Sequence, residues 1–331
     1  MIKYLIRRLA VGLFQLLFIT FVAYFLFFMI ASATGADPAR RIAGKAATPE
    51  RVAEIAHTLG TDRPWYEQYA RFVTNVAHGD LGYSYMKRRS VAEIIFPATT
   101  VTLSLLAGAS ILWTLIAVPV GIVGALWPRS VSDRISAVLI QIAISAPVFW
   151  VAPMLSYLLA YQPSQGKLFG IDVGLSLQMF PIQGYVRLGE SPVQWAWHLL
   201  LPWLAMALGY AALYARFVRA LVSEQMGENY VLVARAKGAS ERRILTSHVG
   251  RLVAPALIIM VGLDVGAMMG GALFVEQAFG LPGLGYVAFS SIQSLDYPMT
   301  MGTITFAAIM TVALNTGADV IHALLDPRVR R

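Results

Sequence analysis

Long runs without charged residues constrain this chain more than any other feature. Residues 9–31 contain no Asp, Glu, Lys or Arg, and the stretches 94–128, 135–166 and 191–215 are equally free of them. A helix needs about 20 mostly apolar residues to cross a bilayer. We therefore predict an all-α integral membrane protein with six transmembrane helices, at 9–31, 98–127, 135–162, 196–220, 252–275 and 297–321.

The overall composition excludes an ordinary soluble domain. Hydrophobic residues make up 57% of the chain and charged residues only 13%, whereas soluble domains carry about 25% charged residues. The net charge of +8 does not indicate nucleic-acid binding, because the basic residues flank apolar runs instead of covering a polar surface. The absence of cysteine excludes disulfides, thiolate catalysis and cysteine zinc sites.

The first apolar run could also be read as a secretory signal peptide. The apolar core of such a peptide is about 7–15 residues long, and the run from Leu9 to Ala31 is longer. We predict an uncleaved membrane anchor.

The distribution of Lys and Arg predicts the orientation. With the N-terminus inside, fifteen of the 26 basic residues flank the spans on the cytoplasmic side. The two shorter outside loops hold only Lys167 and Arg187, and the outside segment 32–97 holds nine. Loops of that length translocate largely regardless of charge. We therefore predict that both termini are cytoplasmic (N-in/C-in).

Two segments outside the spans are long enough to fold. The segment 32–97 combines turn residues and aromatics and is predicted to form an extracytoplasmic cap. Its Trp65, Tyr66 and Tyr69 are either a partner-binding patch or the core of that cap. The cytoplasmic segment 221–251 is predicted to fold as helix, turn and helix.

Motifs for catalysis and nucleotide binding are missing. Neither Gly44-Lys45-Ala46 nor Gly166-Lys167-Leu168 fits a phosphate-binding loop, and there is no HExxH, GxSxG or GxGxxG motif. We expect a non-catalytic chain with no cofactor and no metal site, so that any ATP hydrolysis belongs to a partner chain.

Several short motifs together carry a resemblance to a known family. They are Leu59-Gly60-Thr61-Asp62-Arg63-Pro64, Gly79-Asp80-Leu81-Gly82-Tyr83-Ser84, Tyr230 to Arg243 with His248, Glu276, Pro282-Gly283-Leu284-Gly285, Asp296-Tyr297-Pro298, and Asn315, Asp319 and Asp326-Pro327-Arg328-Val329-Arg330. The chain resembles ABC-importer permeases of the dipeptide/oligopeptide (peptide/nickel) family, of the first-subunit type. It departs from the family pattern at Gly35-Ala36-Asp37-Pro38, Leu295 and His322.

The resemblance implies a type I ABC-importer permease in a bacterial inner membrane. It implies a second, homologous permease subunit, two cytosolic ATP-binding subunits, an extracytoplasmic substrate-binding protein and a short peptide as substrate. ATP binding and hydrolysis in the partners would switch the pore between outward and inward access. A non-peptide solute, such as haem or a nickel chelate, stays an alternative substrate.

Within 221–251, small residues surround a glycine. We expect Ala234, Ala236, Lys237, Gly238, Ala239 and Ser240 to dock in a groove of the ATPase. Small side chains let two backbones approach, and glycine permits a positive φ where the helix gives way to a turn. The alternative is a basic loop that only sets the topology.

The predicted fifth span carries one acid and three evenly spaced glycines. Gly262, Gly266 and Gly270 recur every fourth residue, a spacing that favours close helix packing in lipid. Asp264 lies on nearly the opposite face of the helix. An acid facing lipid costs about 2.5–3.5 kcal/mol on insertion scales. We expect Asp264 to face the translocation path, or else to hydrogen-bond a neighbouring helix.

Two other classes of protein compete with this interpretation. A secondary transporter would need several ionisable residues or broken helices at the membrane midplane, and only Asp264 qualifies. A membrane-embedded enzyme would need a cluster of acids, bases or metal ligands at membrane depth, and no such cluster is evident in the sequence.

Overall fold

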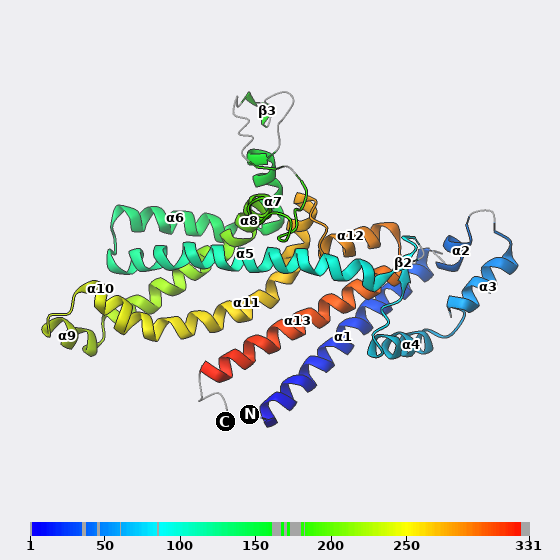
Figure 1. Cartoon of the computed structure of the whole chain (residues 1–331), viewed down its shortest axis with the longest axis horizontal. Helices are drawn as coiled ribbons and strands as arrows, with labels where there is room; N and C mark the ends of the chain where they lie inside the picture. The colour runs from blue at the N-terminus through cyan, green and yellow to red at the C-terminus, as the bar shows by residue number, and fades with distance from the viewer. Residues whose placement is uncertain are drawn as a thin grey trace. The chain divides into compact units, whose positions relative to one another are not determined.

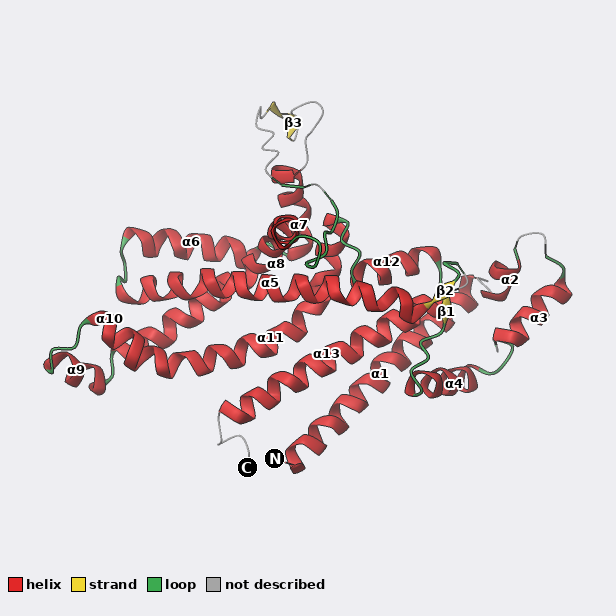
Figure 2. Ribbon diagram, in the orientation of Figure 1, coloured by secondary structure: helices red, strands yellow, loops and turns green. Residues whose placement is uncertain are grey.

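The computed structural model describes residues 2–34, 38–44, 47–59, 61–84, 86–160, 167–168, 171–172, 180–181 and 183–325. The described chain is almost entirely helical, with two short antiparallel strand pairs (Figures 1 and 2). Of the family-like motifs, Gly60 and the C-terminal Asp326–Arg330 lie outside the described residues.

The N-terminal elements are one long helix, three short helices and a strand pair. They are α1 (Ile2–Thr34), α2 (Pro38–Ala43), α3 (Pro49–Leu59), α4 (Trp65–Ala77), β1 (Tyr83–Ser84) and β2 (Arg89–Ser90). The middle of the chain holds α5 (Val91–Leu126), α6 (Val131–Ser145), α7 (Val148–Leu155), the π-helical turn η1 (Ser156–Ala160), β3 (Lys167–Leu168), β4 (Ile171–Asp172) and α8 (Pro192–Met226).

The C-terminal part contains two further long helices with short elements between them. Its elements are α9 (Asn229–Ala236), α10 (Glu241–Arg243), the π-helical turn η2 (Ile244–Val249), α11 (Gly250–Phe279), α12 (Leu284–Ser294) and α13 (Tyr297–Leu325). In the two strand pairs, Tyr83 lies opposite Ser90 and Lys167 opposite Asp172.

Five helices of the described chain are long and apolar enough to cross a membrane, and a bent pair makes a sixth if it is counted as one span. That pair covers the expected third span, 135–162, where α6 and the following helix meet at 105°. The bend lies at Ala146, whose ψ of 113° is extended. Pro147 explains it, because proline pushes the preceding residue out of the helical region.

The chain divides into two compact units, and α5 and α13 each contribute to both. The first unit contains residues 1–100 and 283–316, and the second contains residues 101–282 and 317–331.

In the first unit, two of the family-like motifs meet in a buried joint. The hydroxyl of Ser84 donates a hydrogen bond to Asp296, and both residues are almost fully buried. Asp296 begins α13, where its other carboxylate oxygen accepts from the Met299 N–H, as an N-cap residue does. Gly82 lies against Pro298 in the same joint. These contacts attach the β1–β2 hairpin to the start of α13.

The aromatic residues of the cap pack on α1. Tyr69 donates its hydroxyl to the Leu17 carbonyl at 3.0 Å, and Tyr24 donates to Gln68 at 2.8 Å. The Trp65 ring lies against Phe25 with ring centroids 6.4 Å apart. Trp65 and Tyr69 therefore contact α1, although Trp65 keeps 37% of its surface exposed and Tyr66 keeps 57%.

In the second unit, α5 and α8 approach each other closely at two glycines. A Cβ at Gly108 would overlap the ring of Trp203, and one at Gly121 would lie 2.6 Å from the Cβ of Val218. The Trp203 indole also donates to the Ser104 carbonyl at 3.0 Å. The backbone of α5 at these two glycines therefore packs directly against side chains of α8.

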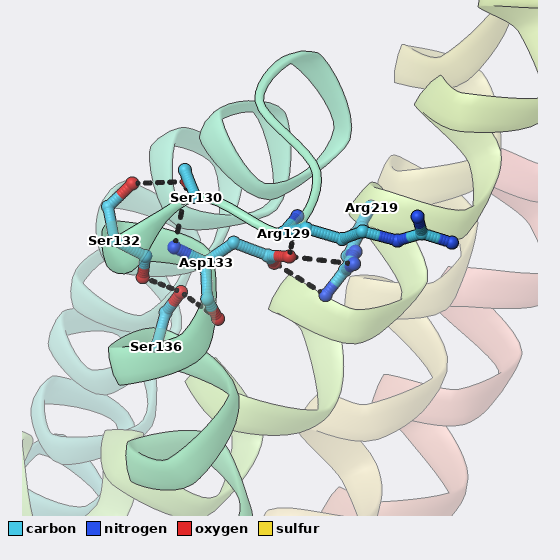
Figure 3. A network of polar contacts seen from close by, with 6 residues as sticks. All are labelled: Arg129, Ser130, Ser132, Asp133, Ser136 and Arg219. Atoms are coloured by element: carbon cyan, nitrogen blue, oxygen red, sulfur yellow. Dashed lines mark hydrogen bonds and ion pairs between the residues drawn. The ribbon is translucent and has the colours of Figure 1, made fainter.

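An ion pair ties α6 to the end of α8 (Figure 3). The guanidinium of Arg219 lies 2.6 Å from Asp133, whose side chain is 8% exposed. The same carboxylate accepts from the Arg129 N–H at 2.8 Å, and Ser130 caps the start of α6. The short turn between α5 and α6 is therefore held against α8.

Candidate functional site

The predicted docking segment is a short helix that ends in a well-formed glycine turn. The Gly238 N–H bonds the Arg235 carbonyl at 2.9 Å, and the Ala239 N–H bonds the Ala234 carbonyl at 3.1 Å. Gly238 has a φ of 81°. This pattern is the Schellman motif, in which glycine takes the left-handed position after the helix. The positive φ predicted for Gly238 is confirmed.

A small hydrophobic core lies under this segment. It joins the end of α8, the helix α9, η2 and the start of α11, and consists of Val218, Val222, Val231, Ala234, Ile244, Val249 and Val253. Ala234 is only 7% exposed within it. The expectation that Ala234 faces a partner therefore does not fit the structure, because its side chain supports the turn from inside the chain.

The opposite side of α9 is exposed and partly apolar. Leu232 is 56% exposed and Val233 is 53% exposed, and Ala236 continues the same surface. Lys237, Gly238 and Ser240 are exposed beyond the helix end, and Ala239 is half-buried. Sequence reasoning missed Leu232 and Val233. Its available signal was the unbroken apolar run 231–234, which one face of a short helix cannot bury.

An ion pair links α9 and α10, the two helices on either side of the turn. Arg235 donates two hydrogen bonds to Glu241, at 2.7 and 3.0 Å. The hydroxyl of Ser240 accepts from the Arg243 N–H and caps α10. The pair is solvent-exposed, so water screens the attraction between its charges. Its two hydrogen bonds link the end of α9 to the start of α10.

Asp264 lies beside a column of aromatic rings. The hydroxyl of Tyr214 on α8 donates to Asp264 at 2.5 Å. Tyr214 in turn stacks on Trp113 of α5, with ring centroids 5.2 Å apart. The hydrogen bond to a neighbouring helix, one of the two expected settings for this acid, is present. Asp264 is also partly exposed.

The three glycines of α11 lie in different surroundings. A Cβ at Gly262 would approach the Cβ of Ala318 on α13 to 3.1 Å, so two backbones come close there. Gly266 is buried. Gly270 is exposed, and a Cβ there would meet nothing within 4 Å.

A second acid of α11 is fully buried. Glu276, 0% exposed, accepts a hydrogen bond of 2.6 Å from the Thr102 hydroxyl of α5. The carbonyl of Glu276 also accepts the N–H of Gly280, which ends α11 with a φ of 60°. Glu276 was recognised only through its family-like motif. A lone acid at a helix end gives no other signal of such a contact.

The residues described above make packing contacts, hydrogen bonds and one exposed ion pair. Within the described residues, no group of three or more His, Cys, Asp or Glu side chains is placed to hold a metal ion. The chain offers apolar helices for a bilayer, a rigid turn beside an exposed apolar face, and one partly exposed acid within a span. The apolar helices are those of a multi-pass membrane protein.

Family comparison agrees with this class. The family described as "Binding-protein-dependent transport system inner membrane component" matches residues 117–331. The corresponding N-terminal family, "Binding-prot-dependent transport system membrane comp, N-term", matches residues 1–106. The chain belongs to this family, which comprises the non-catalytic inner-membrane permease components of ABC transporters.

Curated relatives match along nearly their whole length. The chain is 30% identical to the dipeptide transport system permease protein DppB of Escherichia coli (strain K12), over 100% of this chain and 99% of DppB. It is 33% identical to the glutathione transport system permease protein GsiC of Shigella flexneri serotype 5b, with the same coverage. It is also 33% identical to a putative peptide transport system permease protein of Brucella abortus (strain 2308), over 92% of each chain.

Proposed function

We propose that this chain forms one half of the translocation path of an ATP-driven importer for short peptides. A second, homologous permease supplies the other half, two cytosolic ATP-binding subunits dock below, and an extracytoplasmic binding protein delivers the substrate. The family and the printed names of the relatives support this assignment. The chain itself contributes path and lever, with both termini in the cytoplasm.

The observation that carries the mechanical part of the proposal is the exposed face of α9. Leu232, Val233 and Ala236 present apolar surface to solvent although a hydrophobic core lies directly behind the helix. Apolar surface next to exposed basic side chains, such as Lys237, suits a protein groove better than water. The docking residues are therefore Ala236, Lys237, Gly238, Ala239 and Ser240, with Leu232 and Val233 added and Ala234 as internal support.

Gly238 offers the sharpest test of this docking. Valine strongly disfavours the positive φ that the turn requires, whereas asparagine tolerates it. The space around Gly238 is open in this chain, since a Cβ there would meet nothing within 4 Å. Gly238→Val thus changes the turn, and Gly238→Asn is the matched control that keeps it. Ala236→Trp adds bulk to the docking face without changing the turn.

The measurement is co-purification of the ATP-binding subunits together with substrate-stimulated ATP hydrolysis and uptake. We expect Gly238→Val and Ala236→Trp to lose coupling by roughly tenfold or more, and Gly238→Asn to stay near the native level. If both bulky variants retained bound ATPase and full transport, the segment would act only as a topogenic charge cluster.

A further inference from the structure

A turn of π-helix links the docking segment to the fifth span. The Gly250 N–H bonds the carbonyl of Leu245, five residues back, and η2 runs from Ile244 to Val249. Helix continues on both sides, so that residues 241–279 form one continuous helical segment. π-helical turns are rare insertions in α-helices and occur frequently at functional sites.

The π-turn decides which side chains reach the core beneath α9. Ile244 and Val249 are five residues apart and both are 0% exposed in that core. In an α-helix, positions five apart point about 140° away from each other. The wider turn brings them to the same side. With regular α-helix, His248 would take the place of Val249, whereas in the structure His248 is only half-buried and Val249 is the residue in the core.

Gly250 is the residue that permits this turn. A Cβ at position 250 would lie 2.9 Å from the Leu245 carbonyl oxygen, the atom that accepts the π-type bond. An alanine side chain would crowd that bond and favour the regular helical register. The need for glycine here comes from close approach, because its φ of −59° is ordinary.

We infer that η2 is the joint through which movement of α9 is transmitted to α11, and that Gly250 is its positioning residue. The inference rests on the proposed docking function. The π-turn holds Ile244 and Val249 against Val231 and Ala234 of α9, so displacement of α9 carries the start of α11 with it. A one-residue change of register would turn α11, with Asp264, by about 100° relative to α9.

The first test replaces Gly250 by alanine. Because α9 keeps its outer surface, we expect the Gly250→Ala complex to retain its ATP-binding subunits at the native level while uptake per ATP hydrolysed falls roughly tenfold. The matched control is Gly270→Ala on the same helix, where a Cβ meets nothing within 4 Å. The control should transport within about twofold of the native complex, because its change meets no neighbouring atom.

The second test reads the register directly and does not depend on that variant folding. The chain contains no cysteine, so paired cysteines can be introduced cleanly. In the otherwise native chain, Val231→Cys should crosslink to Val249→Cys and fail to crosslink to His248→Cys. Adding Gly250→Ala should reverse this preference. Thiol crosslinking in membranes, scored by gel mobility, is the readout.

Two results would overturn the inference that η2 transmits movement from α9 to α11. One is crosslinking of position 231 to 248 in preference to 249 in the native chain, which would place regular helix there. The other is native uptake per ATP for Gly250→Ala. Failure of the docking proposal would look different, because Gly238→Val would then leave both ATPase binding and transport unchanged. An impaired Gly238→Val beside a fully coupled Gly250→Ala would reject the joint alone.

Discussion

At the scale of single residues, one small side chain or one polar atom decides what each element touches. Ala234 fits under the docking turn because it is small, and Gly238 closes that turn because it accepts a φ of 81°. Asp264 is held by one hydroxyl, that of Tyr214. The functional proposals therefore rest on side chains whose substitution changes one contact at a time.

Asp264→Asn separates the charge of this residue from its hydrogen bond. The asparagine oxygen still accepts from Tyr214, so the contact between α8 and α11 should persist and the complex should assemble normally. If the acid faces the translocation path, loss of its charge should change uptake by several-fold, the range of typical coupling energies. A cysteine at position 264 should also react with polar thiol reagents in at least one transport state. A thiol at 264 that stays unreactive in every state would contradict the assignment to the path.

The sequence predicted these residues unevenly. Gly238 was predicted because a left-handed turn has a recognisable residue preference. The inward orientation of Ala234 and the exposure of Leu232 and Val233 were not predicted. Which face of a short helix is buried depends here on Val218, Val222 and Val249, which belong to α8 and η2 and not to α9 itself. The partner of Asp264 was equally hidden, since a tyrosine 50 residues earlier leaves no local signal.

At the scale of elements, hydropathy predicted where the long helices lie in the chain, but it did not predict which helices pack against each other. Five of the predicted apolar spans became α1, α5, α8, α11 and α13, with ends that differ from the predicted ones by up to about two turns, and the remaining one became the bent pair at α6 and α7. The evenly spaced glycines of the fifth span predicted close helix packing there. In the second unit, however, the tightest contact at a glycine is on α5, where Gly108 lies against the ring of Trp203. Glycine spacing alone does not identify which neighbour a helix will meet.

Gly108→Ala should destabilise the pair formed by α5 and α8. Its new methyl group would overlap the Trp203 ring, which is itself bonded to Ser104. Overpacking of this kind costs about 1–3 kcal/mol. Gly209→Ala on α8 is the control, because a Cβ there meets nothing within 4 Å; it should be neutral or stabilise by up to about 1 kcal/mol through helix propensity.

Thermal unfolding of the detergent-solubilised chain, followed by size-exclusion fluorescence, measures both variants. We expect Gly108→Ala to lower the transition temperature of the chain, and Gly209→Ala to leave it unchanged or raise it slightly. Equal temperatures for the two would show that α5 and α8 do not meet at Trp203 as described.

At the scale of the whole molecule, the two units hold different candidate functional elements. The first packs α4 on α1 through Tyr24, Tyr69 and their partners, and joins the β1–β2 hairpin to α13 through Ser84 and Asp296. The second carries α9, which we propose docks to the ATP-binding subunit, and Asp264. The family-like motifs at 79–84 and 296–298 are explained by one buried joint, which no local pattern in the sequence could reveal.

We propose above that this chain moves short peptides by means of ATP hydrolysis in separate subunits. The most direct measurement is uptake of a labelled dipeptide into proteoliposomes that contain the chain, its second permease and the ATP-binding subunits, with the binding protein on the outside. We predict uptake that requires internal ATP, stops when this chain is omitted, and is unaffected by dissipating proton and sodium gradients. Uptake by this chain alone, driven by an ion gradient without ATP, would contradict the account.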